Sequence, residues 1–129
     1  PLFVPLAEEG WGDGTVPDLV AERYLAPLIG QQVDTLLLGC THYPLLRPAI
    51  ERVAARLAGR TVAVVDSALA TAHELSARVQ RSSLAAASEA PAVGSLRLLV
   101  TDTPGGFREV AGRFLGGDLA TVPIEQVDL

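Results

Sequence analysis

Residues 33–68 read VDTLLLGCTHYPLLRPAIERVAARLAGRTVAVVDSA. Two short, continuously apolar runs, 33–39 and 60–68, lie on either side of a segment with helical spacing that stops at Gly59. Continuous apolar runs of this length are typical of strands buried on both faces. Glycine directly after the last periodic residue is typical of a helix C-terminus. The stretch therefore predicts a strand–helix–strand unit, in which the two strands are parallel.

The segment before this unit also contains regular elements. The apolar run 2–6 includes Pro5, which predicts an edge strand or the end of a strand. Pro17 is suited to the first turn of a helix, and the residues after it have helical spacing up to Pro27, which we expect to disturb the last turn.

The segment after the unit repeats the alternation. We expect a helix over 68–80, a third buried strand over 96–102, an amphipathic helix that ends near Leu115, and one short strand within 120–129. Strands that alternate with helices predict an α/β fold with a parallel sheet, here a three-layer sandwich that is incomplete.

The composition limits the classes of function. Apolar residues make up 49% of the 129 residues and charged residues 19%, as in a globular protein with a real core. The net charge of −5 argues against a nucleic-acid partner. No apolar stretch is long enough to span a bilayer, and no signal-peptide pattern opens the chain. A single cysteine excludes an internal disulfide and fits a cytoplasmic protein. Since the chain starts at Pro1 and has no methionine, we expect it to be the C-terminal part of a longer protein.

The single cysteine, Cys40, follows the first predicted strand of the unit and precedes its helix. Ligands of open α/β sheets bind outside the carboxyl ends of the strands. A helix N-terminus favours an anion by roughly 0.3–1 kcal/mol, and thiolates form most easily there or beside histidine. Thr41 adds a hydroxyl for a carboxylate, and His42 can exchange a proton near neutral pH. These residues predict a reactive thiol beside an anion-binding loop, although a cysteine here can also be a small apolar packing residue.

Other patterns carry less weight. The glycine-rich stretch 10–14 lacks the strand and spacing of a dinucleotide-binding loop. Cys40 and His42 are only two of the three or four ligands that a zinc site needs, so we predict no metal. Asp66 or Ser67 is a plausible N-cap for the helix over 68–80.

The motif LGCTHYPLLRP (38–48), preceded by VDTLL (33–37) and followed by VVDSA (64–68), resembles glutamate racemase. PLFVPLAEEG (1–10) and VTDTP (100–104) resemble the same family, so the resemblance runs in order over nearly the whole chain. Glutamate racemases need no cofactor. They interconvert L- and D-glutamate with two cysteines on opposite sides of the substrate Cα, and they supply D-glutamate for peptidoglycan.

The resemblance also implies roles for individual residues. Cys40 matches the second catalytic cysteine, which takes the proton from the L-enantiomer in the family. Thr41 and His42 match the pair that contacts the substrate, and His42 is expected to assist Cys40. Glu8 matches an acidic residue that assists the chemistry near the substrate amino group, with Glu9 one position away.

The resemblance implies a division of the chain as well. Residues 1–80 match part of a second α/β lobe that carries the Cys-Thr-His motif, 81–95 a linker, and 96–129 a strand and helix that return to the first lobe. The family's first cysteine, in an Asn-Thr context, is not in this sequence, and neither is its N-terminal Asp-Ser pair. We therefore expect the chain alone to be inactive, and the full-length protein to be a homodimer that binds glutamate and neither nucleic acid nor membrane.

Two alternatives stay open. The chain can come from a racemase of the same superfamily that acts on aspartate or another amino acid. It can also be a non-catalytic α/β binding module in which Cys40 is structural.

Overall fold

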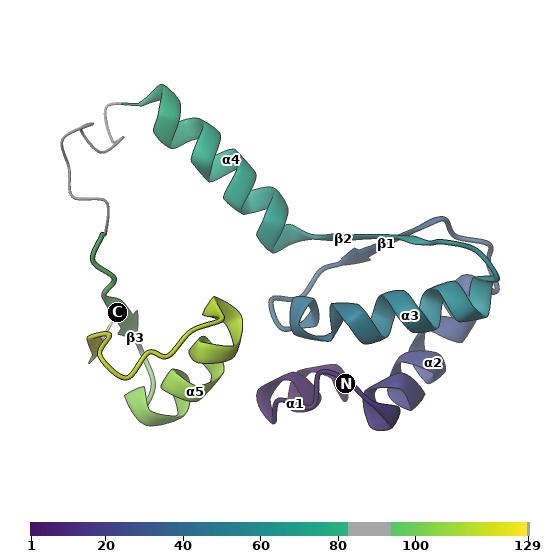
Figure 1. Cartoon of the computed structure of the whole chain (residues 1–129), viewed down its shortest axis with the longest axis horizontal. Helices are drawn as coiled ribbons and strands as arrows, with labels where there is room; N and C mark the ends of the chain where they lie inside the picture. Colours follow the sequence, from purple (N-terminus) through teal and green to yellow (C-terminus); the bar gives the residue numbers. More distant parts are fainter. Residues whose placement is uncertain (83–93, 129) are drawn as a thin grey trace. The chain divides into compact units, whose positions relative to one another are not determined.

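The computed structural model describes residues 1–82 and 94–128, and the chain forms two compact units, 1–83 and 84–129 (Figure 1). The predicted linker, 81–95, lies mostly outside the described residues. The first unit contains the whole strand–helix–strand stretch with the Cys-Thr-His motif, and is therefore the unit that positions the candidate site.

The predicted strand–helix–strand unit is present. Strand β1 (Thr35–Leu38) pairs in parallel with β2 (Ala63–Asp66), and helix α3 (Arg47–Ala58) connects them. A 3₁₀ turn, η1 (Tyr43–Leu46), comes between β1 and α3. Gly59 ends α3 in the left-handed conformation, with φ at 63°, which glycine adopts without steric cost.

Residues 3–8 form a helix and not the strand that we predicted for 2–6. Helix α1 spans Phe3–Glu8, with Pro5 in its first turn. The amides of a first turn have no partner within the helix, so the missing N–H of Pro5 costs nothing there. Phe3 is buried with its ring edge-on to Tyr24 and Tyr43, at centroid distances of 5.2 and 5.3 Å. Tertiary packing of an aromatic residue therefore decides the structure of this segment.

The core of the first unit lies between one face of the β1–β2 sheet and the helices. Helix α2 (Thr15–Ile29) packs against α3 and continues through Pro27 to its end. The prediction that both faces of the strands are buried was wrong. Leu37 is 72% exposed and Val65 46% exposed, whereas their neighbours along the strands are buried. The buried apolar residues of this core are Phe3, Leu6, Ala7, Ala21, Leu25, Ile29, Leu36, Leu38, Leu46, Ile50, Val53, Ala54, Val62 and Val64.

Helix α4 (Ser67–Arg81) starts directly after β2 (Figure 1). Asp66 is its N-cap, as predicted, and accepts a hydrogen bond from the backbone N–H of Leu69 at 2.8 Å. No residue of α4 is buried among the described residues. The helix therefore depends on its cap and its own backbone more than on packing.

The second unit repeats the strand–helix–strand order on a smaller scale. Strand β3 (Leu98–Val100) pairs in parallel with β4 (Ile124–Gln126), and α5 (Pro104–Leu115) connects them. The guanidinium of Arg108 donates to the backbone carbonyls of Leu119 and Val122, which ties α5 to the segment before β4. Both units thus have the α/β architecture with parallel strands that the sequence predicted, in an incomplete form.

Candidate active site

Cys40 lies two residues beyond the end of β1, in a turn that leads into η1, and its side chain is half-buried. The backbone N–H of Tyr43 donates to the carbonyl of Cys40 at 3.2 Å, and that of Leu45 donates to the carbonyl of His42 at 3.1 Å. The sequence predicted a helix over 44–59. The structure has the tighter 3₁₀ turn first, and the α-helix begins only at Arg47.

The structure brings together the four residues that the sequence proposed. His42 Nδ1 lies 3.9 Å from Cys40 Sγ and 3.4 Å from Thr41 Oγ1. On the other side of the ring, His42 Nε2 lies 3.4 Å from Glu8 Oε1. Glu8 is the last residue of α1, which packs against η1. An acidic contact to His42 thus comes from Glu8, the residue to which the resemblance assigns a role near the substrate amino group.

This arrangement has a chemical consequence. A carboxylate only accepts hydrogen bonds, so Glu8 favours the tautomer of His42 that carries its proton on Nε2. The lone pair of Nδ1 then faces Cys40 and can accept the thiol proton. The imidazolium that forms faces the negative charge of Glu8. The pair is partly open to water, since the side chain of His42 is 26% exposed and that of Glu8 51%, so solvent screens this attraction.

Sequence analysis missed a second polar cluster, which lies where β2 ends. The guanidinium of Arg47 donates to Asp66 Oδ2 at 2.7 Å, to the carbonyl of Val64 at 2.9 Å and to Glu51 Oε1 at 2.7 Å. Hydrogen bonds to Glu51 and then to Asp66 hold the pKa of Arg47 above its usual value. Because Leu38 of β1 pairs with Asp66, this cluster marks the same edge of the sheet that Cys40 follows. The spacing of Arg47 and Glu51 by four residues was the available signal.

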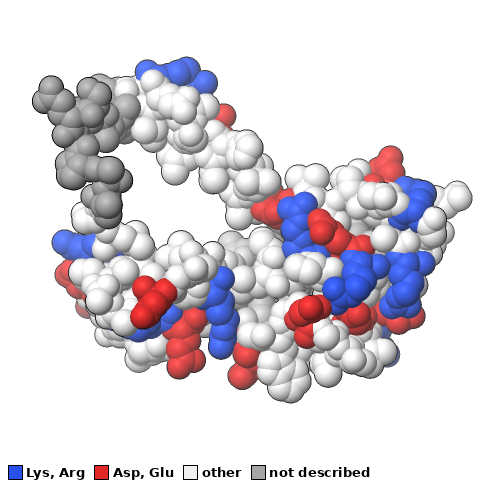
Figure 2. All heavy atoms as spheres, in the orientation of Figure 1, with Lys and Arg blue, Asp and Glu red and all other residues white. Residues whose placement is uncertain are grey.

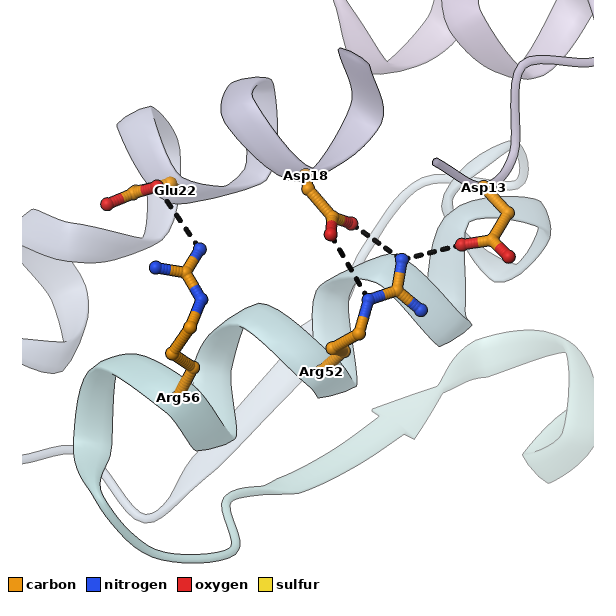
Figure 3. Close-up of polar contacts among 5 residues, drawn as sticks. All are labelled: Asp13, Asp18, Glu22, Arg52 and Arg56. Carbon is orange, nitrogen blue, oxygen red and sulfur yellow. Dashed lines mark hydrogen bonds and ion pairs between the residues drawn. The ribbon is translucent and has the colours of Figure 1, made fainter. Parts of the chain in front are cut away.

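A third cluster joins α3 to α2 and to the loop before it (Figure 3). Arg52 Nη2 lies 2.5 Å from Asp13 Oδ1 and 2.6 Å from Asp18 Oδ1, and Nε donates to Asp18 Oδ2 at 3.2 Å. Arg56, one turn later, donates to Glu22 Oε2 at 3.1 Å. Figure 2 shows acidic and basic side chains gathered side by side over this unit.

The charges of this cluster affect the ionisation of its members. A hydrogen bond from Arg52, a backbone hydrogen bond from Gly14 and the positive charge of Arg52 lower the pKa of Asp13 below its usual range. The two carboxylates, Asp18 first and then Asp13, raise the pKa of Arg52. Asp13 and Arg52 therefore stay ionised at neutral pH.

The part of the chain that the structure describes has neither a metal-ion cluster nor a membrane-spanning helix. Within 1–82 and 94–128, no three His, Cys, Asp or Glu side chains are grouped so that they could hold a metal ion. No helix in the same ranges combines the length and the apolar character needed to cross a membrane.

Comparison with known proteins gives one consistent result. No family model matches the chain. Glutamate racemase of Geobacter metallireducens is 46% identical over 122 residues, which cover 95% of this chain and 43% of that protein. Glutamate racemase of Neisseria gonorrhoeae is 45% identical over 131 residues, covering all of this chain and 44% of that protein.

Solved structures agree with the sequence relatives. The crystal structure of glutamate racemase from Thermus thermophilus in complex with beta-chloro-D-alanine superposes with a TM-score of 0.77 at 38% identity, covering 100% of this chain and 46% of that one. Glutamate racemase from Francisella tularensis in complex with D-glutamate also gives a TM-score of 0.77, at 31% identity, covering 98% and 44%. This chain is homologous to the C-terminal part of glutamate racemases.

The chain spans less than half the length of these glutamate racemases. The comparisons confirm the resemblance that the sequence motifs indicated. Proteins named glutamate racemase are isomerases. The roles of Cys40, Thr41, His42 and Glu8 are not tested by these comparisons and stay predictions. To these predicted roles the structure adds the contacts among the four residues.

Proposed function

We propose that this chain contributes one side of the active site of a glutamate racemase, with Cys40 as one of the two cysteines that exchange the α-proton. The observation that carries the proposal is the continuous set of contacts from Cys40 through His42 to Glu8, at 3.9 and 3.4 Å, beyond the carboxyl end of β1. A relative that binds D-glutamate supports the choice of substrate.

The proposed step moves one proton at a time. The thiol proton of Cys40 first passes to Nδ1 of His42, which leaves a thiolate beside an imidazolium that faces Glu8. The thiolate then takes the α-proton of L-glutamate and becomes a thiol, while the electron pair of the broken C–H bond stays on the substrate as a carbanion. A thiol on the opposite face returns a proton to carbon and gives D-glutamate. Preorganised donors and exclusion of water must stabilise the carbanion.

Thr41 has a binding role in this proposal. Its hydroxyl lies 3.4 Å from Nδ1 of His42, the same nitrogen that lies 3.9 Å from Cys40 Sγ. A hydroxyl there can donate a hydrogen bond to a substrate carboxylate while Nδ1 of His42 accepts the thiol proton of Cys40. The proposal includes no cofactor and no metal. It places the full-length enzyme in the cytoplasm as a homodimer that supplies D-glutamate for peptidoglycan.

The test needs a full-length form, in which residues 1–129 follow an N-terminal part such as the relatives have. In deuterium oxide, this form is expected to incorporate deuterium at the α-carbon of L-glutamate. A Cys40→Ser variant is expected to lose that exchange, because an alcohol is a far weaker acid than a thiol. Undiminished exchange in the variant would exclude Cys40 as the base.

The same assay separates the alternatives. Faster exchange with L-aspartate than with L-glutamate would favour an aspartate racemase. Exchange with neither acid, together with labelling of Cys40 by iodoacetamide no faster than that of free cysteine, would favour a binding module with a structural cysteine. Racemisation by residues 1–129 alone would contradict the expectation that the second cysteine lies outside this chain.

A further inference from the structure

The loop that follows Glu8, residues 9–14, folds back on the end of α1. The backbone N–H of Gly10 donates to the carbonyl of Ala7 at 3.1 Å, and that of Trp11 donates to the carbonyl of Leu6 at 2.8 Å. Gly10 has φ at 77°, a conformation that glycine reaches without strain. The path of this loop and the orientation of Glu8 are therefore linked by direct backbone hydrogen bonds.

The same loop touches the segment that carries His42. A Cβ atom at Gly12 would lie 2.8 Å from the carbonyl oxygen of Leu45, closer than real Cβ atoms approach backbone. The N–H of Leu45 donates to the carbonyl of His42. Gly12 thus allows the backbone of the loop to pack on Leu45 of η1, and a backbone hydrogen bond connects Leu45 to His42.

Asp13 holds this loop against α3. Its carboxylate pairs with Arg52 at 2.5 Å, and Arg52 is fixed from its other side by two hydrogen bonds to Asp18 (Figure 3). Helix α3 continues directly from η1. The Asp13–Arg52 pair therefore connects the chain just after Glu8 to the chain just after His42.

We propose that Asp13 and Arg52 are positioning residues that hold Glu8 at Nε2 of His42, an inference that rests on the proposed racemase function. Helix α1 has only six residues, and a helix of that length is not stable by itself. Its last residue is placed by what surrounds it, and on the C-terminal side that is the loop anchored by Gly12 and Asp13. Loss of the anchor lets Glu8 move away from His42 without removing either side chain.

The chain offers a matched control. Arg56 of α3 and Glu22 of α2 form an ion pair one turn further along these helices than Arg52 and Asp18. Both are surface residues like Asp13 and Arg52. Among the described residues, the side chains of this pair form their ion pair with each other and not with the loop 9–14. Glu22→Gln therefore removes one exposed ion pair, as Asp13→Asn does, and leaves the anchor of Glu8 intact.

The experiment compares Asp13→Asn and Glu22→Gln in the full-length form, with Gly12→Ala as a second way to displace the loop. The anchor acts through the exposed Glu8–His42 contact, which contributes no more than about fivefold, so we expect kcat for glutamate to fall about two- to fivefold in Asp13→Asn and Gly12→Ala. KM should stay within about twofold because Thr41 and Cys40 are not disturbed. Glu22→Gln should keep the kcat of the unmodified enzyme, and the melting temperatures of Asp13→Asn and Glu22→Gln should fall alike.

Equal kcat values in Asp13→Asn and Glu22→Gln would overturn the inference, because a purely structural role affects both variants in the same way. If the unmodified full-length form does not racemise glutamate, the proposed function fails separately. The rate of Cys40 labelling by iodoacetamide then decides the inference: slower labelling in Asp13→Asn than in Glu22→Gln supports it, and equal rates reject it.

Discussion

Replacing Glu8 by glutamine tests the contact that organises the candidate site. The change keeps the size of the side chain and removes its charge, so Nε2 of His42 loses the carboxylate that lies 3.4 Å away. The neutral amide stabilises an imidazolium less well. Transfer of the thiol proton from Cys40 to His42 should therefore become less favourable, and a smaller fraction of Cys40 should be thiolate at neutral pH.

The exposure of the two side chains sets the size of the effect. Glu8 is half exposed and His42 a quarter exposed, so the pair resembles a surface ion pair more than a buried one. Exposed pairs contribute about 0.2–1 kcal/mol, which corresponds to a change of about 1.4- to 5-fold when 1.4 kcal/mol equals a factor of ten. Removal of one partner from a buried ion pair would cost about 3–5 kcal/mol, which corresponds to a change of more than about a hundredfold.

Alkylation of the single cysteine by iodoacetamide provides the assay, because one thiol in the chain gives an unambiguous rate by mass spectrometry. The thiolate is the reacting species, so the rate follows the thiolate fraction. Glu9→Gln is the matched control. It removes the same charge one residue later, at the C-cap of α1.

We expect Glu8→Gln to label about 1.4- to 5-fold more slowly than the unmodified chain at neutral pH, and Glu9→Gln to label at the unmodified rate. Equal rates for the two variants would refute the reasoning, because charge alone would then explain the effect. A hundredfold decrease would also refute it, since the pair would have to be shielded from water in solution.

Two other regions give measurable expectations. Asp66→Ala removes the N-cap of α4 and a partner of Arg47, and should lower the stability of the helix by about 0.5–2 kcal/mol, seen as reduced helicity by circular dichroism. Ser67→Ala, at the other residue that the sequence offered as a cap, should leave helicity unchanged; equal losses would contradict the assignment. The hydrogen bond and charge of Arg52 lower the pKa of Asp13 below 3.8. The contribution of Asp13 to the free energy of unfolding is therefore complete above pH 3.8, and it is lost as the pH falls through the lower pKa of the folded state. In a carboxyl carbon NMR titration, Asp13 should titrate below 3.8 in the unmodified chain and move up towards it in Arg52→Gln; a midpoint that does not move would exclude the ion pair as the cause.

The strand–helix–strand unit was predictable because each of its signals is local. Gly59 ends α3, Pro48 lies in its first turn and Asp66 caps the next helix, as their residue types require. The burial of the strands was not predictable in the same way. Leu37 and Val65 are as apolar as their neighbours, and a continuous apolar run does not record which face a given set of helices covers.

For a related reason, the sequence predicted only part of the candidate site. Cys40, Thr41 and His42 are consecutive, so their proximity follows from the chain itself. Glu8 is 34 residues from His42, and only the resemblance to glutamate racemases pointed to it. Asp13 is 39 residues from Arg52, and no local pattern relates an acid in a glycine-rich loop to a base on a distant helix.

The misassigned segment 2–6 and the contact between Glu8 and His42 have one physical cause. Phe3, the first residue of α1, packs edge-on against Tyr43, the neighbour of His42, while Glu8, the last residue of α1, reaches His42 itself. Five steps along a helix advance about 7.5 Å, whereas five steps along a strand advance about 17 Å. Only the helical form is short enough for both ends of the segment to contact the same turn. The helix that replaces the predicted strand is therefore what brings the carboxylate of Glu8 to the imidazole.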